Sequence, residues 1–208
     1  MEFSEVLNNR RTYRDYSDRE VSDEILYKVI SAAFKAPTND HLRQFEFVVV
    51  RDRENIAKVI APLAKNMAAF KDLVFEVDNT GDKDKMAMFA DALPKQQRML
   101  MQSGLLIIPF YNQKQGPLLH SVEQSSLNYF ASAWCALENM LLAATDEGLG
   151  TVFHIPVADE AEQIKKIVNA PEGYEFICLL SMGYPADGAF LPKQKEINIH
   201  DRIHFNSF

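Results

Sequence analysis

Cysteine is scarce in this chain of 208 residues, which contains only Cys135 and Cys178. Neither has a second cysteine or a histidine at the spacing of a metal site, and the two are far apart in the sequence. Both lie in apolar runs, so we expect two buried core thiols in a reducing compartment. A structural disulfide between them is the less favoured alternative.

Signals for export, membrane insertion and nonspecific nucleic-acid binding are also missing. No apolar run approaches the ~20 residues that cross a bilayer, and Met1-Glu2-Phe3-Ser4 lacks the charged-then-apolar layout of a signal peptide. A net charge of −7 opposes binding to the phosphates of nucleic acids. We therefore expect a cytoplasmic protein without nucleic-acid or membrane partners, folded as a single domain over residues 1–208.

The common motifs of metal, catalytic-triad and nucleotide sites are absent from the sequence. Neither HExxH nor a comparable ligand spacing occurs among the histidines, which are His41, His120, His154, His200 and His204. There is also no Gly-x-Ser-x-Gly elbow, Gly-x-Gly-x-x-Gly turn or Walker loop. We predict no metal site, and we expect any bound nucleotide to be held without a Rossmann or P-loop cradle.

Helical and strand patterns alternate along the chain, with helices in the majority, which predicts an α+β fold. Helical periodicity predicts helices over 3–9, 22–36, 54–73, 84–102 with a break at Pro94, 121–147 and 159–169. Runs of β-branched and aromatic residues predict strands over 45–50, 104–111, 149–155 and 174–183. Ser22 is the clearest helix cap, because Asp23 and Glu24 follow it in the first turn.

The segment 121–147 has the strongest helical pattern in the chain. Apolar side chains recur on one face every three or four residues: Leu127, Phe130, Trp134, Leu137, Leu141 and Ala144. Its other faces consist largely of alanine and methionine, and a helix that is apolar nearly all round is a buried one. Gly148 follows it and suits the left-handed conformation found just past helix ends. We therefore predict that this is the central helix.

Basic residues are clustered at two places in this acidic chain. Arg10, Arg11 and Arg14 lie in one short segment, and Lys193 and Lys195 lie near the C-terminus. Guanidinium groups grip phosphate with two parallel hydrogen bonds and stay charged at every relevant pH. The clusters therefore suggest a site for a small anion, although an exposed, solvated face gives the same pattern.

Six segments that follow one another in the chain are similar to signatures of one known family. They are Asn9 to Tyr16, Ala36-Pro37-Thr38-Asn39, Phe45 to Val50, Leu137 to Thr151, Gly183-Tyr184-Pro185 and Leu191 to Lys195. In that order they resemble the Arg-Arg-Ser-x-Arg-x-Phe start, Ala-Pro-Ser-Ser turn, aromatic-led strand, Glu-Asn-Leu-Leu-Leu-Ala-Ala helix, Gly-Tyr-Pro turn and basic close of nitroreductase-family flavoproteins. Each motif is short, but the set covers nearly the whole chain in the family's order.

The resemblance implies an α+β fold of the nitroreductase type, with a central mixed β-sheet flanked by helices. It also implies an intertwined homodimer that holds one FMN at each of two sites between the subunits. It assigns to the phosphate, ribityl chain and pyrimidine edge of FMN the residues Arg10, Arg11, Thr12, Arg14, Gln96, Lys193 and Lys195. Over and along the ring it assigns Pro37, Thr38 and Asn39 of the other subunit, His41 in the same turn, and His154, Ile155 and Pro156.

Two departures from the family pattern bear on those contacts. Where the family has Asn-x-Gln-Pro-Trp, this chain has His41 to Phe45, so that Arg43 adds a positive charge and the Asn and Gln amides are missing. A core or surface role for His41 and Arg43 is the alternative to a flavin contact. A basic residue that the family often carries before the second strand falls near Met99, which predicts that this contact is absent and that Gln96 substitutes for it.

The implied reaction is a ping-pong cycle in which FMN carries the hydride and the protein supplies position and electrostatics. NADH or NADPH reduces FMN and leaves, and a small flat acceptor such as a nitroaromatic or a quinone then takes its place. Arg10 or Arg14 would stabilise the negative charge of reduced flavin, and no side chain is predicted to be catalytic. Candidates for the wall of the acceptor slot, or alternatively for ordinary core, are Phe70, Phe75, Met86, Met88 and Phe89.

Other functions are compatible with the same residues. A flavin sensor or carrier would bind FMN without oxidising NAD(P)H, and the unusual segment from His41 to Phe45 leaves room for it. A specialised reductase on the same fold, such as an ene-reductase, a dehalogenase or a flavin-fragmenting enzyme, is another alternative. A domain whose arginines are only surface residues would bind no flavin at all.

Overall fold

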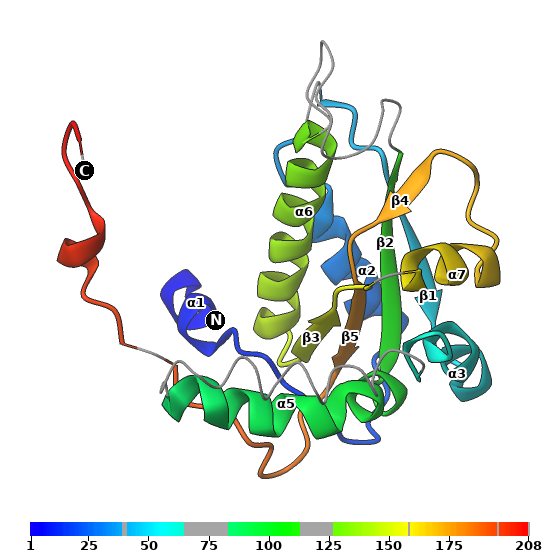
Figure 1. The fold of residues 1–208 in the computed structure, drawn as a ribbon, viewed down its shortest axis with the longest axis horizontal. Coiled ribbons are helices and arrows are strands. Elements are labelled where there is room, and N and C mark those ends of the chain that lie inside the picture. Colours follow the sequence, from blue (N-terminus) through cyan, green and yellow to red (C-terminus); the bar gives the residue numbers. More distant parts are fainter. Residues whose placement is uncertain (39–40, 65–82, 113–126, 158, 195, 208) are drawn as a thin grey trace.

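A computed structural model describes residues 1–38, 41–64, 83–112, 127–157, 159–194 and 196–207 of the chain (Figure 1). Its five strands are β1 (Phe45–Val50), β2 (Leu105–Asn112), β3 (Gly150–His154), β4 (Tyr174–Phe176) and β5 (Leu179–Gly183). They form one sheet in the order β1-β2-β5-β3, with β4 also paired to β2. Each of these pairings is antiparallel. The parallel component of the expected mixed sheet is, among the described residues, the isolated bridge between Thr12 and Thr151.

Helices pack on both faces of the sheet, because its central strand is apolar on both faces. In β2, Leu105 and Ile107 belong to one core cluster, and Leu106 and Ile108 belong to the other. The first cluster includes side chains of α2 (Asp23–Ala33) and α6 (Leu127–Asp146). The second includes side chains of α3 (Arg53–Ile60), α5 (Lys83–Met101) and α7 (Glu160–Ile167). The predicted α+β fold is confirmed.

The helix α2 begins where its cap was predicted. The Ser22 hydroxyl accepts a hydrogen bond from the Ile25 amide at 3.3 Å, which satisfies a donor that the first turn leaves unpaired. Its other end is tied to α6, because the Asn139 side-chain amide donates to the Ala32 carbonyl at 3.1 Å. One residue of the Glu138-Asn139 motif therefore joins two helices of the same layer.

The central helix is confirmed as α6, but one of its faces is open in the single chain. Leu137, Met140 and Ala144 are buried in the core, whereas Cys135 is exposed. The prediction that both cysteines are buried was thus wrong for Cys135 and right for Cys178. Cys135 shares the exposed face with Glu138 because residues three or four apart lie above one another on a helix.

Three predicted boundaries were wrong. The break expected at Pro94 does not occur, since α5 runs unbroken from Lys83 to Met101. Ala90 and Pro94 are both exposed, so water can satisfy the carbonyl that lacks a proline N–H partner. The strand expected over 174–183 is divided into β4 and β5, and the helix expected over 54–73 ends at Ile60, with 65–73 outside the described residues.

The two ends of the chain lie apart from the sheet. The helix α1 (Phe3–Asn9) packs on α6, and the Met1 amino group lies 2.6 Å from the Asp146 carboxylate. Figure 1 shows the C-terminal tail, which contains the 3-10 turn η3 (Ile199–Arg202), extending away from the rest of the fold. Among the described residues no helix has the length and apolar character needed to cross a membrane.

Candidate functional site

The arginine segment lies against β3 as an additional short piece of extended chain. The Tyr13 amide donates to the Thr151 carbonyl at 3.0 Å, and Thr12 forms a parallel bridge with Thr151. This approach requires a glycine at position 150, because a Cβ atom there would lie only 2.6 Å from the Tyr13 Cβ. Gly148 has a different role, since it ends α6 with a φ of 74°.

A pocket of about 150 Å³ opens beside this segment. Its lining comes from the arginine segment, α5 and the tail, and consists of Arg10, Arg11, Thr12, Arg14, Met88, Pro192, Lys193 and Gln194. We call it the arginine pocket. Two basic clusters that are about 180 residues apart in the chain therefore meet at one place, which local sequence patterns do not reveal. Lys195 lies outside the described residues.

Each arginine of the pocket is held by a different part of the fold. The Arg10 Nε lies 3.8 Å from the Glu138 Oε1 of α6, and Arg11 donates to the Pro192 carbonyl of the tail. The Arg14 Nη1 lies 3.3 Å from the Asp91 Oδ2 of α5. Guanidinium groups have five N–H donors, so these single contacts leave donors for a bound anion.

A network of ion pairs joins Arg14 and its neighbour Asp15 to α5. Lys95 Nζ lies 2.6 Å from the Asp91 Oδ1 and also bonds Asp15, while the Arg98 Nη2 lies 2.7 Å from the other Asp15 oxygen. Partial burial works to lower the pKa of Lys95, but its hydrogen bonds to Asp15 and Asp91 outweigh burial, and the pKa is raised. The network thereby joins the arginine segment to α5.

Sequence patterns did not predict this network of ion pairs. Arg98, next to the buried Met99, is a basic residue of this helix, and its guanidinium bonds Asp15. Asp91 and Lys95 are four residues apart on one helix, which is the spacing of a helical ion pair and the one local signal that was available. Their link to Asp15 spans 80 residues and depends on the tertiary fold.

The structure brings together two further predicted residues, Gln96 and His154. The His154 Nδ1 lies 3.3 Å from the Gln96 Oε1, and its Nε2 lies 2.9 Å from the Glu160 Oε2. Glu160 is only 1% exposed, and the same oxygen accepts a hydrogen bond from the Val157 amide at 2.9 Å. A buried carboxylate thus fixes both ends of the stretch from His154 to Val157, which includes Ile155 and Pro156. Sequence reasoning did not identify Glu160.

The described residues of the turn from Pro37 to Gln44 are not part of the arginine pocket. Neither Pro37, Thr38 nor His41 lines the arginine pocket, and Asn39 is outside the described residues. Thr38 instead lines a cavity of about 10 Å³ together with Arg43 and Gln44. His41 and Arg43 have φ angles of 54° and 46°, which non-glycine residues seldom adopt. The Oε1 of Gln44 is buried without a hydrogen-bond partner in the described chain.

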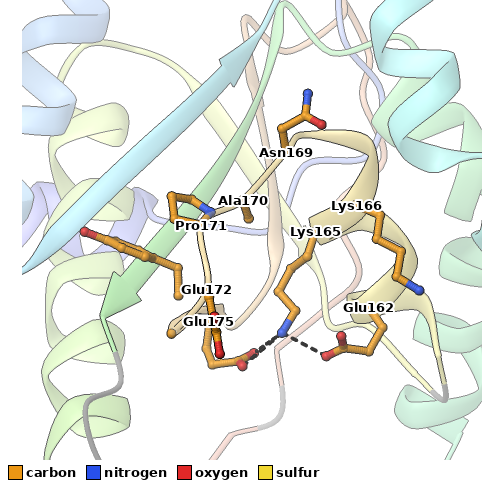
Figure 2. A pocket seen from close by; sticks show the side chains of 10 residues that line it. Glu162, Lys165, Lys166, Asn169, Ala170, Pro171, Glu172 and Glu175 are labelled. Atoms are coloured by element: carbon orange, nitrogen blue, oxygen red, sulfur yellow. Dashed lines mark hydrogen bonds and ion pairs between the residues drawn. The ribbon is translucent and has the colours of Figure 1, made fainter.

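A second hollow, of about 700 Å³, lies between the end of α7 and β4 (Figure 2). We call it the α7–β4 hollow. Figure 2 shows Lys165 bonded to carboxylates on both sides, at 2.8 Å from Glu162 and 2.9 Å from Glu175. Burial works to lower the pKa of Lys165, but these two carboxylates raise it above its ordinary value. None of the predicted site residues that the structure describes lines this hollow.

The chain matches one family profile and several named proteins. The sequence profile described as "Nitroreductase family" matches residues 7–184. A protein of Methanothermobacter thermautotrophicus named "Putative NADH dehydrogenase/NAD(P)H nitroreductase" is 30% identical over 210 residues, which cover 100% of this chain and 88% of that protein. An iodotyrosine deiodinase of Haliscomenobacter hydrossis is 24% identical over 191 residues, which cover 92% of this chain and 82% of its own.

The fold itself is shared with solved structures. The crystal structure of oxidised iodotyrosine deiodinase bound to FMN and 3-iodo-L-tyrosine superposes with a TM-score of 0.75 at 20% sequence identity. The match covers 99% of this chain and 100% of that one. The overall fold of this chain is therefore a known one.

Proposed function

This chain belongs to the nitroreductase family of oxidoreductases, and from that premise we propose that it is an FMN-dependent NAD(P)H oxidoreductase. One observation carries the proposal. Arg10, Arg11, Thr12 and Arg14, from five consecutive positions, converge with Lys193 on a single pocket. Several cations that meet at one hollow in a chain of net charge −7 are typical of a site for an anionic ligand.

The arginine pocket suits the phosphate of FMN. Its volume of about 150 Å³ accommodates a phosphate group, so the larger ring of FMN would lie outside the pocket. Arg11 of the arginine segment and Lys193 of the tail both line it and can donate to an anion, and Thr12 lines it as well. We assign the phosphate to Arg10, Arg11 and Lys193, with Lys195 as a further contact, and the pyrimidine edge of the ring to Arg14 and Gln96.

When bound, FMN supplies hydride transfer from NADH or NADPH to a flat acceptor such as a nitroaromatic or a quinone, the two substrates using one site in turn. The residues of the chain bind and orient. The Arg14 guanidinium, only 11% exposed, supplies a positive charge in a partly desolvated place where it favours the more negative state of a ligand. The stretch from His154 to Pro156, held by Glu160 and Gln96, offers a rigid edge for the ring.

We further propose that the active form is a homodimer. The tail carries large apolar side chains that are exposed in the single chain: Phe190, Ile197, Ile199, Ile203 and Phe205. Exposed apolar surface of this extent marks interaction sites, and a second copy of the chain would cover it. Pro37, Thr38, Asn39 and His41 of the partner subunit would then cover the ring of the FMN whose phosphate lies in the arginine pocket. Sedimentation of an Ile199→Asp/Phe205→Asp variant, which we expect to be monomeric, tests the dimer.

The relatives favour reductive dehalogenation as a second candidate activity. Several of them are named iodotyrosine deiodinase, in organisms from Haliscomenobacter hydrossis to Rattus norvegicus. An aromatic acceptor with a halogen fits the same description of a flat substrate. The two activities are separated by offering a nitroaromatic, a quinone and 3-iodotyrosine to the same reduced protein and comparing the rates at which it is reoxidised.

A visible spectrum tests the proposal. The purified protein is recorded before and after NADH or NADPH is added under nitrogen. A yellow protein that bleaches supports the oxidoreductase, and yellow colour without bleaching indicates an FMN-binding sensor or carrier. A protein that stays colourless after incubation with FMN contradicts the proposal.

A further inference from the structure

The positive charge of Arg14 is not isolated in the fold. Its Nη1 lies 3.3 Å from the Asp91 Oδ2, and the two side chains are 11% and 7% exposed. Most of their surface is therefore removed from water, where a charge is costly unless it has a partner. Asp91 itself is fixed from its other oxygen by Lys95, four residues further along α5, at 2.6 Å.

The charged side chains around the Arg14–Asp91 pair determine the net charge on this side of the arginine pocket. Arg14, Lys95 and Arg98 contribute three positive charges, and Asp15 and Asp91 contribute two negative ones. Asp15 is bonded to Lys95 and Arg98, and no bond to Arg14 is present among the described contacts. Among the described carboxylates, Asp91 is thus the one that contacts Arg14, the arginine assigned to the flavin ring.

We propose that Asp91 is a positioning residue, which holds the Arg14 guanidinium toward the flavin site and offsets part of its charge. The inference rests on the proposed function. A carboxylate at this distance restricts Arg14 to one orientation, and its negative charge opposes the attraction of Arg14 for the more negative, reduced form of FMN. Asp91 therefore lowers the preference of the site for reduced over oxidised FMN.

The sign of the effect follows from Coulomb's law. In Asp91→Asn the charge is removed and an oxygen that can accept from Arg14 is kept. One unit charge at the edge of a partly buried site changes the ratio of the dissociation constants for oxidised and reduced FMN about tenfold, in favour of reduced FMN. For a two-electron couple this is a rise in midpoint potential of about 30 mV.

A purely structural role for Asp91 makes a different prediction. If Asp91 only attaches the arginine segment to α5, its loss lowers thermal stability and weakens the binding of both redox states of FMN alike. The ratio of the two dissociation constants then stays as it is in the wild type. The ratio is therefore the measurement that separates the two roles.

The experiment uses the full chain loaded with FMN. The dissociation constant of oxidised FMN is measured by fluorescence quenching, and the midpoint potential by reductive titration against a reference dye. We compare Asp91→Asn, Asp91→Glu and Lys95→Gln with Glu175→Gln, which removes an ion-paired carboxylate on β4, opposite Tyr111 of β2. The expected result is a higher potential for Asp91→Asn, a lower one for Lys95→Gln, and wild-type values for Asp91→Glu and Glu175→Gln.

The outcomes are distinguishable. An unchanged potential in both Asp91→Asn and Lys95→Gln overturns the role of Asp91 and leaves the flavin site intact. A wild-type protein that binds no FMN overturns the proposed function, and with it this inference. If Asp91→Asn does not fold, Lys95→Gln still decides, because a potential that fails to fall contradicts the charge balance.

Discussion

The arginine pocket and the α7–β4 hollow differ in size and in the balance of their charges. The hollow is the larger, at about 700 Å³ against about 150 Å³. Its Lys165 ammonium already bonds the carboxylates of Glu162 and Glu175. In the arginine pocket, Arg14 and Lys193 each have one carboxylate partner, Asp91 and the exposed Glu196. Arg11 bonds a backbone carbonyl, and the nearest described carboxylate to Arg10 is 3.8 Å away.

This difference shows that volume does not identify the anion site. An anion that enters the α7–β4 hollow has to displace carboxylates from Lys165 or meet their repulsion. An anion in the arginine pocket meets donors that converge and still have capacity. Variants in and around both sites test this contrast.

The largest effect is expected for Arg10→Ala/Arg14→Ala. Charge-assisted hydrogen bonds contribute about 1.5–3 kcal/mol each, so the loss of two raises the dissociation constant of FMN by a factor of about 10² to 10⁴. Fluorescence titration of the apoprotein measures it, and Lys165→Met in the other hollow is the matched control. A double variant that is purified with full flavin occupancy would contradict the assignment.

The next effect concerns the seating of the arginine segment on β3. Gly150→Ala places a Cβ 2.6 Å from that of Tyr13, and the resulting displacement costs about 1–3 kcal/mol of unfolding free energy. Chemical denaturation measures the loss. Gly148→Asn is the control, because no atom lies within 4 Å of its Cβ position and asparagine tolerates its positive φ. Equal stability of Gly150→Ala and the wild type would refute the close approach.

A smaller loss is expected for Glu160→Gln. The amide oxygen still accepts one hydrogen bond, but the charge that holds His154 is gone, which costs about 1–2 kcal/mol. Denaturation of the apoprotein measures the loss. Glu160→Ala should lose more, since both His154 and the Val157 amide then lack an acceptor. If Glu160→Ala is as stable as Glu160→Gln, these contacts do not hold the segment.

The smallest effect is expected for Glu175→Gln in the α7–β4 hollow. Its carboxylate makes the same kind of bond as Glu160, but its side chain is 40% exposed, and water already screens the pair with Lys165. The expected loss is below about 1 kcal/mol, with no change in FMN affinity. A loss equal to that of Glu160→Gln would show that burial does not set the difference between the two carboxylates.

Local patterns predicted most elements of the fold. Ser22 caps α2, and the run Phe45–Val50 forms a strand, because capping and β-branched composition act through neighbouring residues. The errors depend on the environment of each residue in the fold. The helix α5 continues through Pro94 because this side is exposed to water, whereas packing partners divide the chain between β4 and β5 and leave Cys135 facing outward.

Only part of the candidate site was predicted, because local motifs mark some of its residues and not others. Arg10, Arg11, Thr12, Arg14 and Lys193 were recognisable as residue types and motifs, and the structure gathers them in one pocket. Glu160 and Asp91 were not recognised, because nothing near them in the chain marks a buried carboxylate. Their partners His154 and Arg14 lie 6 and 77 residues away.

The sequence by itself determined the family, the order of the elements and the residue types that can hold an anion, because these depend on composition and spacing along the chain. Only the tertiary structure decided which of those cations stay available to a ligand. Lys165 is neutralised by Glu162 on its own helix and by Glu175 on β4, whereas Arg10, Arg11 and Lys193 meet around the arginine pocket, with the exposed Glu196 as the described partner of Lys193. The physical reason is that charge compensation depends on distances in space, which the chain fixes only when it folds.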